Sequence, residues 1–288
     1  MKIILVSDVN SENKSTIPYG LKLAAALKAE VTVVHMIDTR SQHGTASSYA
    51  DSHTVSPGGK LSFEEVTKRN KSQAKKNLDN VLSSETSRLN YPLKVNTIIE
   101  EDSVVDILER LTSEANVSLV VYPSKPDHHT FAYEKEIVQT CKEVGTLSLL
   151  VPPGFEFKSL ENNVLLTDFS EEDNEQYKDI SAVMSAFHPR ITGLAVVKNE
   201  DERNTMNGNG HAWKEKANTL FQDAAVESDT TEGKDDYDAI AGYIQHDGFS
   251  SMILCHRKKS AIKRLFSSDD LHKLFEKVNI PVLFHAAG

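Results

Sequence analysis

Two aspartates at the ends of short apolar runs are the first residues of the chain that could contact a ligand. Asp8 follows Ile4-Leu5-Val6-Ser7, and Asp168 follows Val164-Leu165-Leu166-Thr167. Each run is short enough to be a buried strand, and the polar residues after it could begin a helix. A carboxylate at this point either faces a ligand or caps a helix and stabilises a turn. The residues themselves leave both interpretations open.

A basic segment near the C-terminus could bind an anionic ligand. Its five cations are Arg257, Lys258, Lys259, Lys263 and Arg264. They could neutralise phosphate, or they could form a solvated loop that pairs with Asp269, Asp270 or another domain. The chain as a whole carries a formal net charge of -10, which disfavours non-specific binding to nucleic acid or to anionic lipid. An anionic ligand would therefore need a local basic pocket.

Familiar catalytic and metal-binding patterns are missing from the sequence. It has no G-x-S-x-G elbow, P-loop or H-E-x-x-H pattern. Carboxylate clusters such as Glu171-Glu172-Asp173 precede predicted helices, where acidic residues interact favourably with the helix dipole. His128 and His129 lack a cysteine or carboxylate at ligand spacing. We therefore expect neither a metal site nor enzymatic activity.

Composition and the N-terminus indicate an intracellular, cytoplasmic protein. Hydrophobic residues make up 39% and charged residues 26% of the chain, as in soluble globular proteins. Only four consecutive apolar residues, Ile3 to Val6, precede polar ones, too few for a secretory signal. Cys141 and Cys255 are single and far apart, which favours reduced core thiols over a disulfide or a zinc site.

The two strand-plus-aspartate stretches belong to a longer internal repeat. An offset of 160 residues pairs Asp8 with Asp168, and it also pairs a helix beginning near Ile17 and the strand 31–38 with their counterparts. An offset of 133 then pairs the helix that contains Val104 and the strand 119–122 with a helix and strand of the second half. A match without gaps over several elements indicates a duplicated domain.

Each half alternates strands with helices, which predicts an α/β fold with two tandem repeats. We expect each repeat to be an open five-stranded parallel sheet with helices on both faces. For the common order 3-2-1-4-5, a ligand would bind where the order reverses, between the first and fourth strands. Pro152-Pro153-Gly154 predicts a joint between domains 1–155 and 160–288. In the second domain, Asn207-Gly208-Asn209-Gly210 predicts a turn before a helix that contains Trp213.

The chain resembles the universal stress protein family in its tandem form, over nearly its whole length. The residues that carry the resemblance are Leu165-Leu166-Thr167-Asp168-Phe169-Ser170, the fainter Leu5-Val6-Ser7-Asp8, the second strand Val33-Val34-His35-Met36-Ile37-Asp38, and Arg264-Leu265-Phe266-Ser267-Ser268. Nucleotide-binding members carry G-x2-G-x9-G-[ST] after the fourth strand. Here Cys255, Lys258 and Ser268 stand at the glycine positions and Asp269 at the hydroxyl position.

The resemblance implies which residues would line a nucleotide site, were one retained in the second half. Asp168, with Thr167 and Phe169 beside it, would be the base- or ribose-side partner, and Val196 and Met36 stand where the family packs the base. Cys255, Arg257, Lys258 and Lys263 would lie near the phosphates, at a helix that Ser267 or Ser268 would cap. In the first half, Tyr122-Pro123-Ser124-Lys125-Pro126 also lacks glycine, and Glu134 and Glu136 would repel a triphosphate. Asp8 is the first-half equivalent of Asp168.

The resemblance and the missing glycines together favour one function over two others. We expect a cytoplasmic stress-response protein without enzymatic activity or cofactor, acting through a partner or a small ligand. The alternatives are an adenine-nucleotide (ATP) binder that uses the second half, and an enzyme whose chemistry no sequence feature reveals. The last strands of the two halves, 146–151 and 281–285, could pair within one chain as a pseudo-dimer. A homodimer is the other possible assembly.

Overall fold

The computed structural model of the chain describes residues 1–9, 11, 14–37, 63–101, 103–114, 116–126, 130–170, 174–256 and 268–286. The elements of the first half are β1 (Lys2–Val6), α1 (Thr16–Leu27), β2 (Glu30–Met36), α3 (Phe63–Thr86), β3 (Val95–Glu100), α4 (Val104–Glu114), β4 (Leu119–Pro123), α5 (Glu134–Val144) and β5 (Ser148–Val151). The elements of the second half are β6 (Asn162–Leu166), α6 (Asn174–Met184), η1 (Ser185–Phe187), β7 (Arg190–Val197), α7 (Glu200–Leu220), β8 (Ala225–Glu232), α8 (Asp236–Asp247), β9 (Ser251–His256), α9 (Ser268–Lys277) and β10 (Val282–Ala286).

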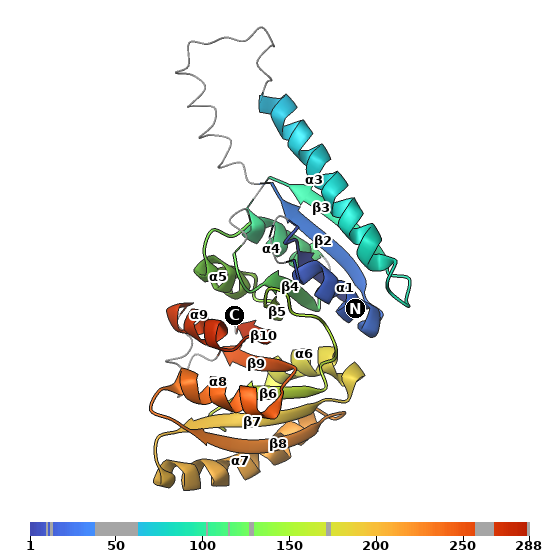
Figure 1. Cartoon of the computed structure of the whole chain (residues 1–288). Coiled ribbons are helices and arrows are strands. Elements are labelled where there is room, and N and C mark those ends of the chain that lie inside the picture. The colour runs from blue at the N-terminus through green and yellow to red at the C-terminus, as the bar shows by residue number, and fades with distance from the viewer. Residues whose placement is uncertain are drawn as a thin grey trace, which may run out of the picture.

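The strands of both halves form one ten-stranded sheet in the order β3-β2-β1-β4-β5-β10-β9-β6-β7-β8 (Figure 1). Each half has the order 3-2-1-4-5 with parallel pairing, so the predicted fold class is confirmed. The halves meet where β5 and β10 pair antiparallel, with Leu149 opposite Leu283. The predicted pseudo-dimer within one chain is therefore present, and this pairing leaves neither final strand as a free edge.

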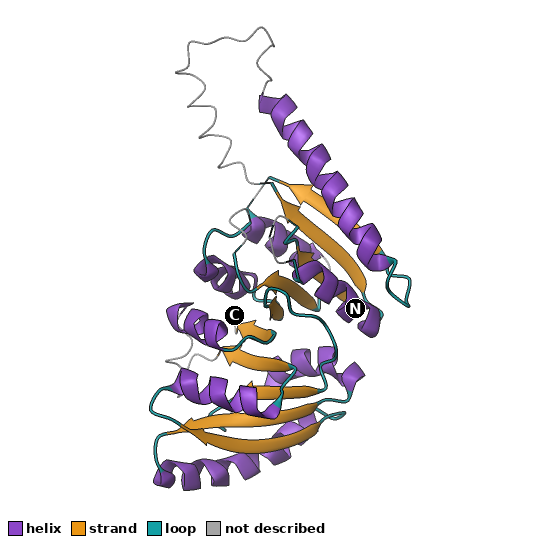
Figure 2. Cartoon of the chain, in the orientation of Figure 1, coloured by secondary structure: helices purple, strands orange, loops and turns teal. Residues whose placement is uncertain are grey.

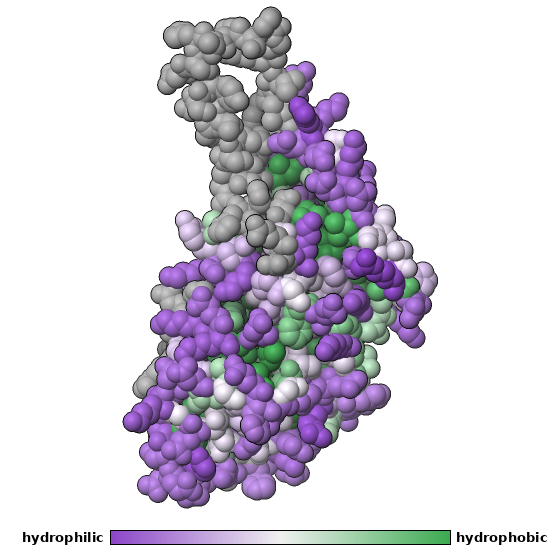
Figure 3. Space-filling view, in the orientation of Figure 1, coloured by the Kyte–Doolittle hydropathy of each residue, from purple (hydrophilic) through white to green (hydrophobic). Residues whose placement is uncertain are grey.

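Helices cover both faces of the sheet (Figure 2). Buried side chains alternate along each strand, so that Leu5 and Leu165 belong to one apolar cluster and Val6 and Leu166 to the other. The first cluster packs under α1, α3, α6 and α7, and the second under α4, α5, α8 and α9. The visible outer face is hydrophilic over most of its area (Figure 3). This division is what a parallel sheet buried on both faces requires.

The boundaries of the helices and strands bear out the internal repeat. The offset of 160 carries β2 (Glu30–Met36) onto β7 (Arg190–Val197), and the offset of 133 carries α4 onto α8. One prediction is wrong: Asn207 to Gly210 forms no turn but lies inside α7. That helix begins earlier because the side chain of Asn199 accepts the N–H of Glu202 at 2.9 Å.

Gly210, within α7, serves close packing instead of a turn. A Cβ added at Gly210 would lie 2.9 Å from the Ser228 hydroxyl on β8. The helix can approach the sheet at this point because the side chain is only a hydrogen. Gly210, one of the residues that predicted a turn, is therefore needed for close contact between α7 and β8.

The segment between the halves packs against both of them. The ring of Phe157 lies 5.1 Å from that of Tyr19 on α1 and 6.0 Å from that of Phe187 in η1, between centroids and edge to face in both cases. Gly154 has φ +72 and donates its N–H to the Ser15 hydroxyl at 3.1 Å. The predicted joint is thus held by aromatic contacts and a hydrogen bond. Within the described residues, no helix is both long enough and apolar enough to span a bilayer.

Candidate functional site

Each half has a point at the carboxyl end of its first strand where the strand order reverses. β1 lies between β2 and β4, and β6 lies between β7 and β9, so the strand order reverses at these two strands. Asp8 follows β1 and Asp168 follows β6. The two aspartates are therefore equivalent in the fold, and their surroundings decide whether they can serve a ligand.

Asp8 is committed to helix α1. Its side chain is 2% exposed, and its Oδ2 accepts the N–H of Ser15 at 2.7 Å and of Thr16 at 2.8 Å. Ser15, at the N-cap position, makes no capping hydrogen bond with its own side chain. Burial raises the pKa of Asp8, although the two backbone N–H groups oppose the shift. Asp8 therefore acts as a remote helix cap in the protein interior.

Beside Asp8, a buried serine contacts a buried histidine. The Ser7 hydroxyl lies 3.1 Å from Nδ1 of His35 on β2. Both residues are buried, and the Ser7 oxygen also accepts the N–H of Val9 at 3.3 Å. The corresponding residues of the second half are Thr167 and Ala195, which cannot make this contact. The polar pair distinguishes the first half, and its only sequence signal was a histidine within an apolar strand.

Asp168 is more open to solvent and closes a tight turn. Its Oδ1 accepts the backbone N–H of Ser170 at 3.1 Å and the Ser170 hydroxyl at 2.5 Å. Its side chain is half-buried, whereas that of Asp8 is buried. One residue earlier, the Thr167 hydroxyl accepts the N–H of Phe169 at 3.0 Å. The turn holds the Asp168 carboxylate at the carboxyl edge of the sheet.

Phe169 anchors this turn in the core. Its backbone has φ +54, a left-handed conformation that is unusual for a bulky residue. Its ring is buried and lies 5.5 Å, between centroids, from that of Trp213 on α7. A Cβ at Gly193 on β7 would come within 2.5 Å of the Trp213 ring and 3.2 Å of the Phe169 ring. Phe169 therefore points into the apolar cluster, and Asp168 is the candidate site residue of this turn.

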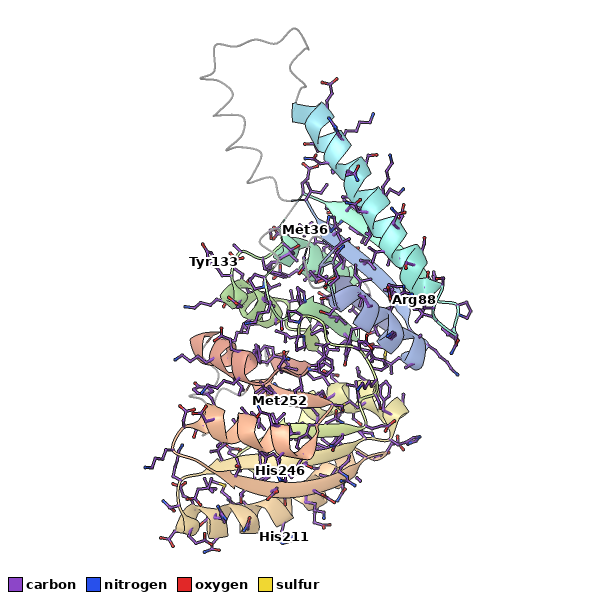
Figure 4. The ribbon with its side chains drawn as sticks, viewed as in Figure 1. Met36, Arg88, Tyr133, His211, His246 and Met252 are labelled. Carbon is purple, nitrogen blue, oxygen red and sulfur yellow. The ribbon has the colours of Figure 1, made fainter. Side chains whose placement is uncertain are left out.

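The other expected site residues flank the turn without converging on one face. Val196 is half-buried and packs against the cluster under α8 and α9, whereas Cys255 is buried in the cluster that holds Phe169. In the first half, Met36 ends β2 and is buried (Figure 4). Arg257, Lys258, Lys263 and Ser267 lie outside the described residues, as does the segment 39–60. Of Ser268, only its place as the first residue of α9 is described.

In the first half, two carboxylates stand in the first turn of α5, the helix that follows β4. Glu136, in the first turn of α5, accepts the N–H of Ala132 through Oε2 at 2.6 Å. Glu134 stands in the same turn, and its Oε1 lies 3.7 Å from Nζ of Lys125. The backbone and dipole at a helix N-terminus favour an anion, and here the protein supplies that anion itself.

A metal site is not assembled in the described part of the chain. No group of three or more His, Cys, Asp or Glu side chains among these residues is placed to hold a metal ion. Both cysteines are free and buried, and burial raises the pKa of the Cys141 thiol to about 12. Such a thiol stays protonated and unreactive at neutral pH.

Comparison with known proteins identifies the fold. The sequence matches no protein-family model and no curated protein. The structure is similar to a universal stress protein from Archaeoglobus fulgidus, with a TM-score of 0.63 and 14% identity, covering 100% of this chain and 96% of that one. It is also similar to a functionally unknown protein from Pseudomonas aeruginosa, with a TM-score of 0.55 and 10% identity, covering 99% of this chain and 92% of that one.

A third similar structure is one domain of a transport protein. It is the cytoplasmic domain of a prokaryotic cation chloride cotransporter, with a TM-score of 0.52 and 10% identity, covering 99% of this chain and 95% of that one. The chain is thus a tandem of two doubly wound α/β domains joined by their last strands. In particular, it has the universal stress protein fold in its tandem form.

Proposed function

We propose that the chain is a non-enzymatic, cytoplasmic stress-response protein that acts through a protein partner or a small ligand and needs no nucleotide cofactor. In this proposal the first half is a scaffold and the second half, at Asp168, is the working half. The universal stress protein fold supports a role in the stress response. The different burial of Asp8 and Asp168 supports the division into a scaffold half and a working half.

The contact between Glu136 and Ala132 carries the part of the proposal that concerns nucleotides. A triphosphate at the start of α5 would have to displace this carboxylate, which already accepts a backbone N–H at 2.6 Å. The triphosphate would also be repelled by the carboxylate of Glu134, and the loop after β4 has no glycines whose N–H groups could bind the phosphates in compensation. Asp8 offers a ligand no contact in compensation, because its side chain is 2% exposed and its Oδ2 already accepts two N–H groups. We therefore infer that the first half binds no nucleotide.

Adenine-nucleotide binding in the second half is the competing function. The observation in its favour is the half-buried carboxylate of Asp168 at the carboxyl edge of β6, where Asp8 of the other half is buried. Arg257, Lys258 and Lys263 follow β9 in the sequence and could supply the charge for phosphate. Asp168 would then contact the ribose or the base.

Native mass spectrometry of the purified full chain separates these functions. We expect the chain to carry no adenine nucleotide. An adduct with the mass of AMP, ADP or ATP that disappears in Asp168→Ala would contradict the proposal. The control Asp223→Ala changes an exposed aspartate in the turn before β8 and should leave any adduct in place. Hydrolysis of ATP by the wild type that is lost in Asp168→Ala would contradict the non-enzymatic part.

A further inference from the structure

The two edges of the ten-stranded sheet differ in their chemistry. β3 lies at one edge and β8 at the other (Figure 1). β8 carries three carboxylates, those of Glu227, Asp229 and Glu232, and no cation. Charges on an edge strand oppose its pairing with another strand. β3 has no charge, proline or glycine from Val95 to Ile99. The edge at β3 is therefore the one whose chemistry permits a further strand.

The backbone of β3 presents hydrogen-bonding groups at this edge. The carbonyl oxygen of Glu100 accepts the N–H of Ile37, so the even-numbered residues of β3 bond to β2. The N–H and C=O groups of Val95, Thr97 and Ile99 face away from the sheet. In the part of the chain that the structure describes, no helix or loop supplies a backbone hydrogen bond to these groups. Such a row is a template for a further strand.

Helix α3 packs on one face of β3 and leaves the middle of the strand open. Leu78 of α3 is buried in the cluster against which Val95 and Ile99 pack. Thr97 lies between these two residues on the same face, and it is exposed. On the other face Ile98 is half-buried. Hydrophobic atoms gather beside α3 on the visible surface (Figure 3).

The sequence of β3 is complementary to itself in an antiparallel pair. If Thr97 lies opposite the partner's Thr97, then Val95 lies opposite the partner's Ile99, and Lys94 lies opposite the partner's Glu100. The residues whose backbone faces the edge then meet one another, and each such pair exchanges two hydrogen bonds. A shift of the register by two residues would no longer place Lys94 opposite a carboxylate. Charge and hydrogen bonding therefore favour the same register.

The charged residues at the ends of β3 already belong to ion pairs on the surface. Nζ of Lys94 lies 3.1 Å from Oε1 of Glu30 on β2, and the guanidinium of Arg110 on α4 lies 2.8 Å from Oε1 of Glu100. The side chain of Lys94 is 66% exposed, which leaves it room for a second carboxylate. In the antiparallel pair each copy contributes one Lys94 and one Glu100, and opposite charges facing each other across two strands are stabilising. Two copies of β8 would bring only carboxylates together.

We propose that β3 is a dimerisation edge and that its partner is a second copy of this chain, paired antiparallel about Thr97. The pairing joins two ten-stranded sheets into one continuous sheet. A two-fold axis then relates the copies, as in most homodimers. The second halves lie at the outer ends of this sheet, so the dimer leaves Asp168 of each copy unobstructed. The inference does not rest on the proposed function.

Sedimentation equilibrium of the purified full chain tests the charge pairing. We expect the wild type to dimerise at micromolar concentration. Lys94→Glu or Glu100→Lys alone replaces both opposite-charge contacts by like-charge contacts and should weaken the dimer about tenfold or more. An equimolar mixture of the two variants restores opposite charges in the heterodimer and should dimerise again. Lys158→Glu, which makes the same charge change at an exposed residue between the halves, should leave the dimer unchanged.

A cysteine at the two-fold axis tests the register. Residues that exchange both hydrogen bonds in an antiparallel pair have Cα atoms about 5.5 Å apart, which suits a disulfide. Thr97→Cys should therefore form a disulfide-linked dimer under mild oxidation. Thr230→Cys on β8, the other edge strand, is the matched control and should stay unlinked. The native Cys141 and Cys255 are buried and should not contribute.

Four results would overturn the proposal. A monomeric wild type would leave the edge at β3 to an extended segment of another protein. A dimer unaffected by Lys94→Glu and Glu100→Lys, or variants that do not dimerise on mixing, would place the contact elsewhere. Crosslinking through Thr230→Cys but not Thr97→Cys would assign it to β8. Far-ultraviolet circular dichroism confirms that each variant is folded. None of these results bears on Asp168, so this test and that of the proposed function fail independently.

Discussion

Replacing each of the two equivalent aspartates by alanine should have very different effects on stability. In Asp8→Ala, the N–H groups of Ser15 and Thr16 lose their acceptor inside the protein, since both residues are buried. An orphaned buried donor costs about 1–3 kcal/mol. Part of this cost is offset, because the variant no longer buries a carboxylate, whose burial is unfavourable and raises the pKa of Asp8. We expect a net loss of about 2–3 kcal/mol, estimated from these terms.

The companion variant Asp168→Ala should lose little stability. Asp168 is half-buried, and its carboxylate accepts two groups of Ser170 at the protein surface, which water can satisfy instead. We expect a loss of at most about 1 kcal/mol, the usual net value of such a hydrogen bond. Urea unfolding at pH 7 of the wild type and both variants measures the difference. Equal losses, or a larger loss in Asp168→Ala, would refute the division into a buried, helix-capping aspartate and a half-buried one.

Three further predictions concern the same elements. Gly193→Ala should destabilise the second half by about 1–3 kcal/mol and alter Trp213 fluorescence, because the new Cβ would lie 2.5 Å from that ring. The control Gly242→Ala, with open space around its Cβ, should stabilise α8 by about 0.5–1 kcal/mol. A Gly193→Ala variant more stable than Gly242→Ala would contradict this packing. Phe157→Ala should cost about 1–3 kcal/mol through two lost aromatic contacts, whereas exposed Lys158→Ala should cost nothing measurable in the same urea experiment. Because the pKa of Asp8 is raised in the folded protein, its stabilising contribution is complete below the ordinary value of 3.8 and is lost as pH rises through the raised value; the stability of the wild type relative to Asp8→Asn should therefore be greater at pH 4 than at pH 7, and an unchanged difference would contradict the burial of the charge.

Much of the fold could be predicted because it depends on periodic patterns. The duplicated apolar runs define the strands, and the offsets of 160 and 133 predict which elements correspond. The antiparallel contact of Leu149 with Leu283 followed from two apolar strands that would otherwise be edges. The turn expected at Asn207 to Gly210 was wrong because local propensity yielded to the packing of Gly210 against β8.

The site was predicted less well because its contacts are not local. Ser15 is the residue that local capping rules favour for α1, yet the cap comes from Asp8, seven residues earlier. Phe169 was expected near a ligand, but its ring packs in the core against Trp213, which is far away in the sequence.

Calorimetric titration of the purified full chain with ATP tests the central claim most directly. If the first half is a scaffold whose anion site is filled by Glu136, and the second half uses Asp168 without a nucleotide, no saturable heat should appear in the micromolar range. Saturable micromolar binding that is abolished in Asp168→Ala and retained in Asp223→Ala would contradict this account and establish the second half as a nucleotide site.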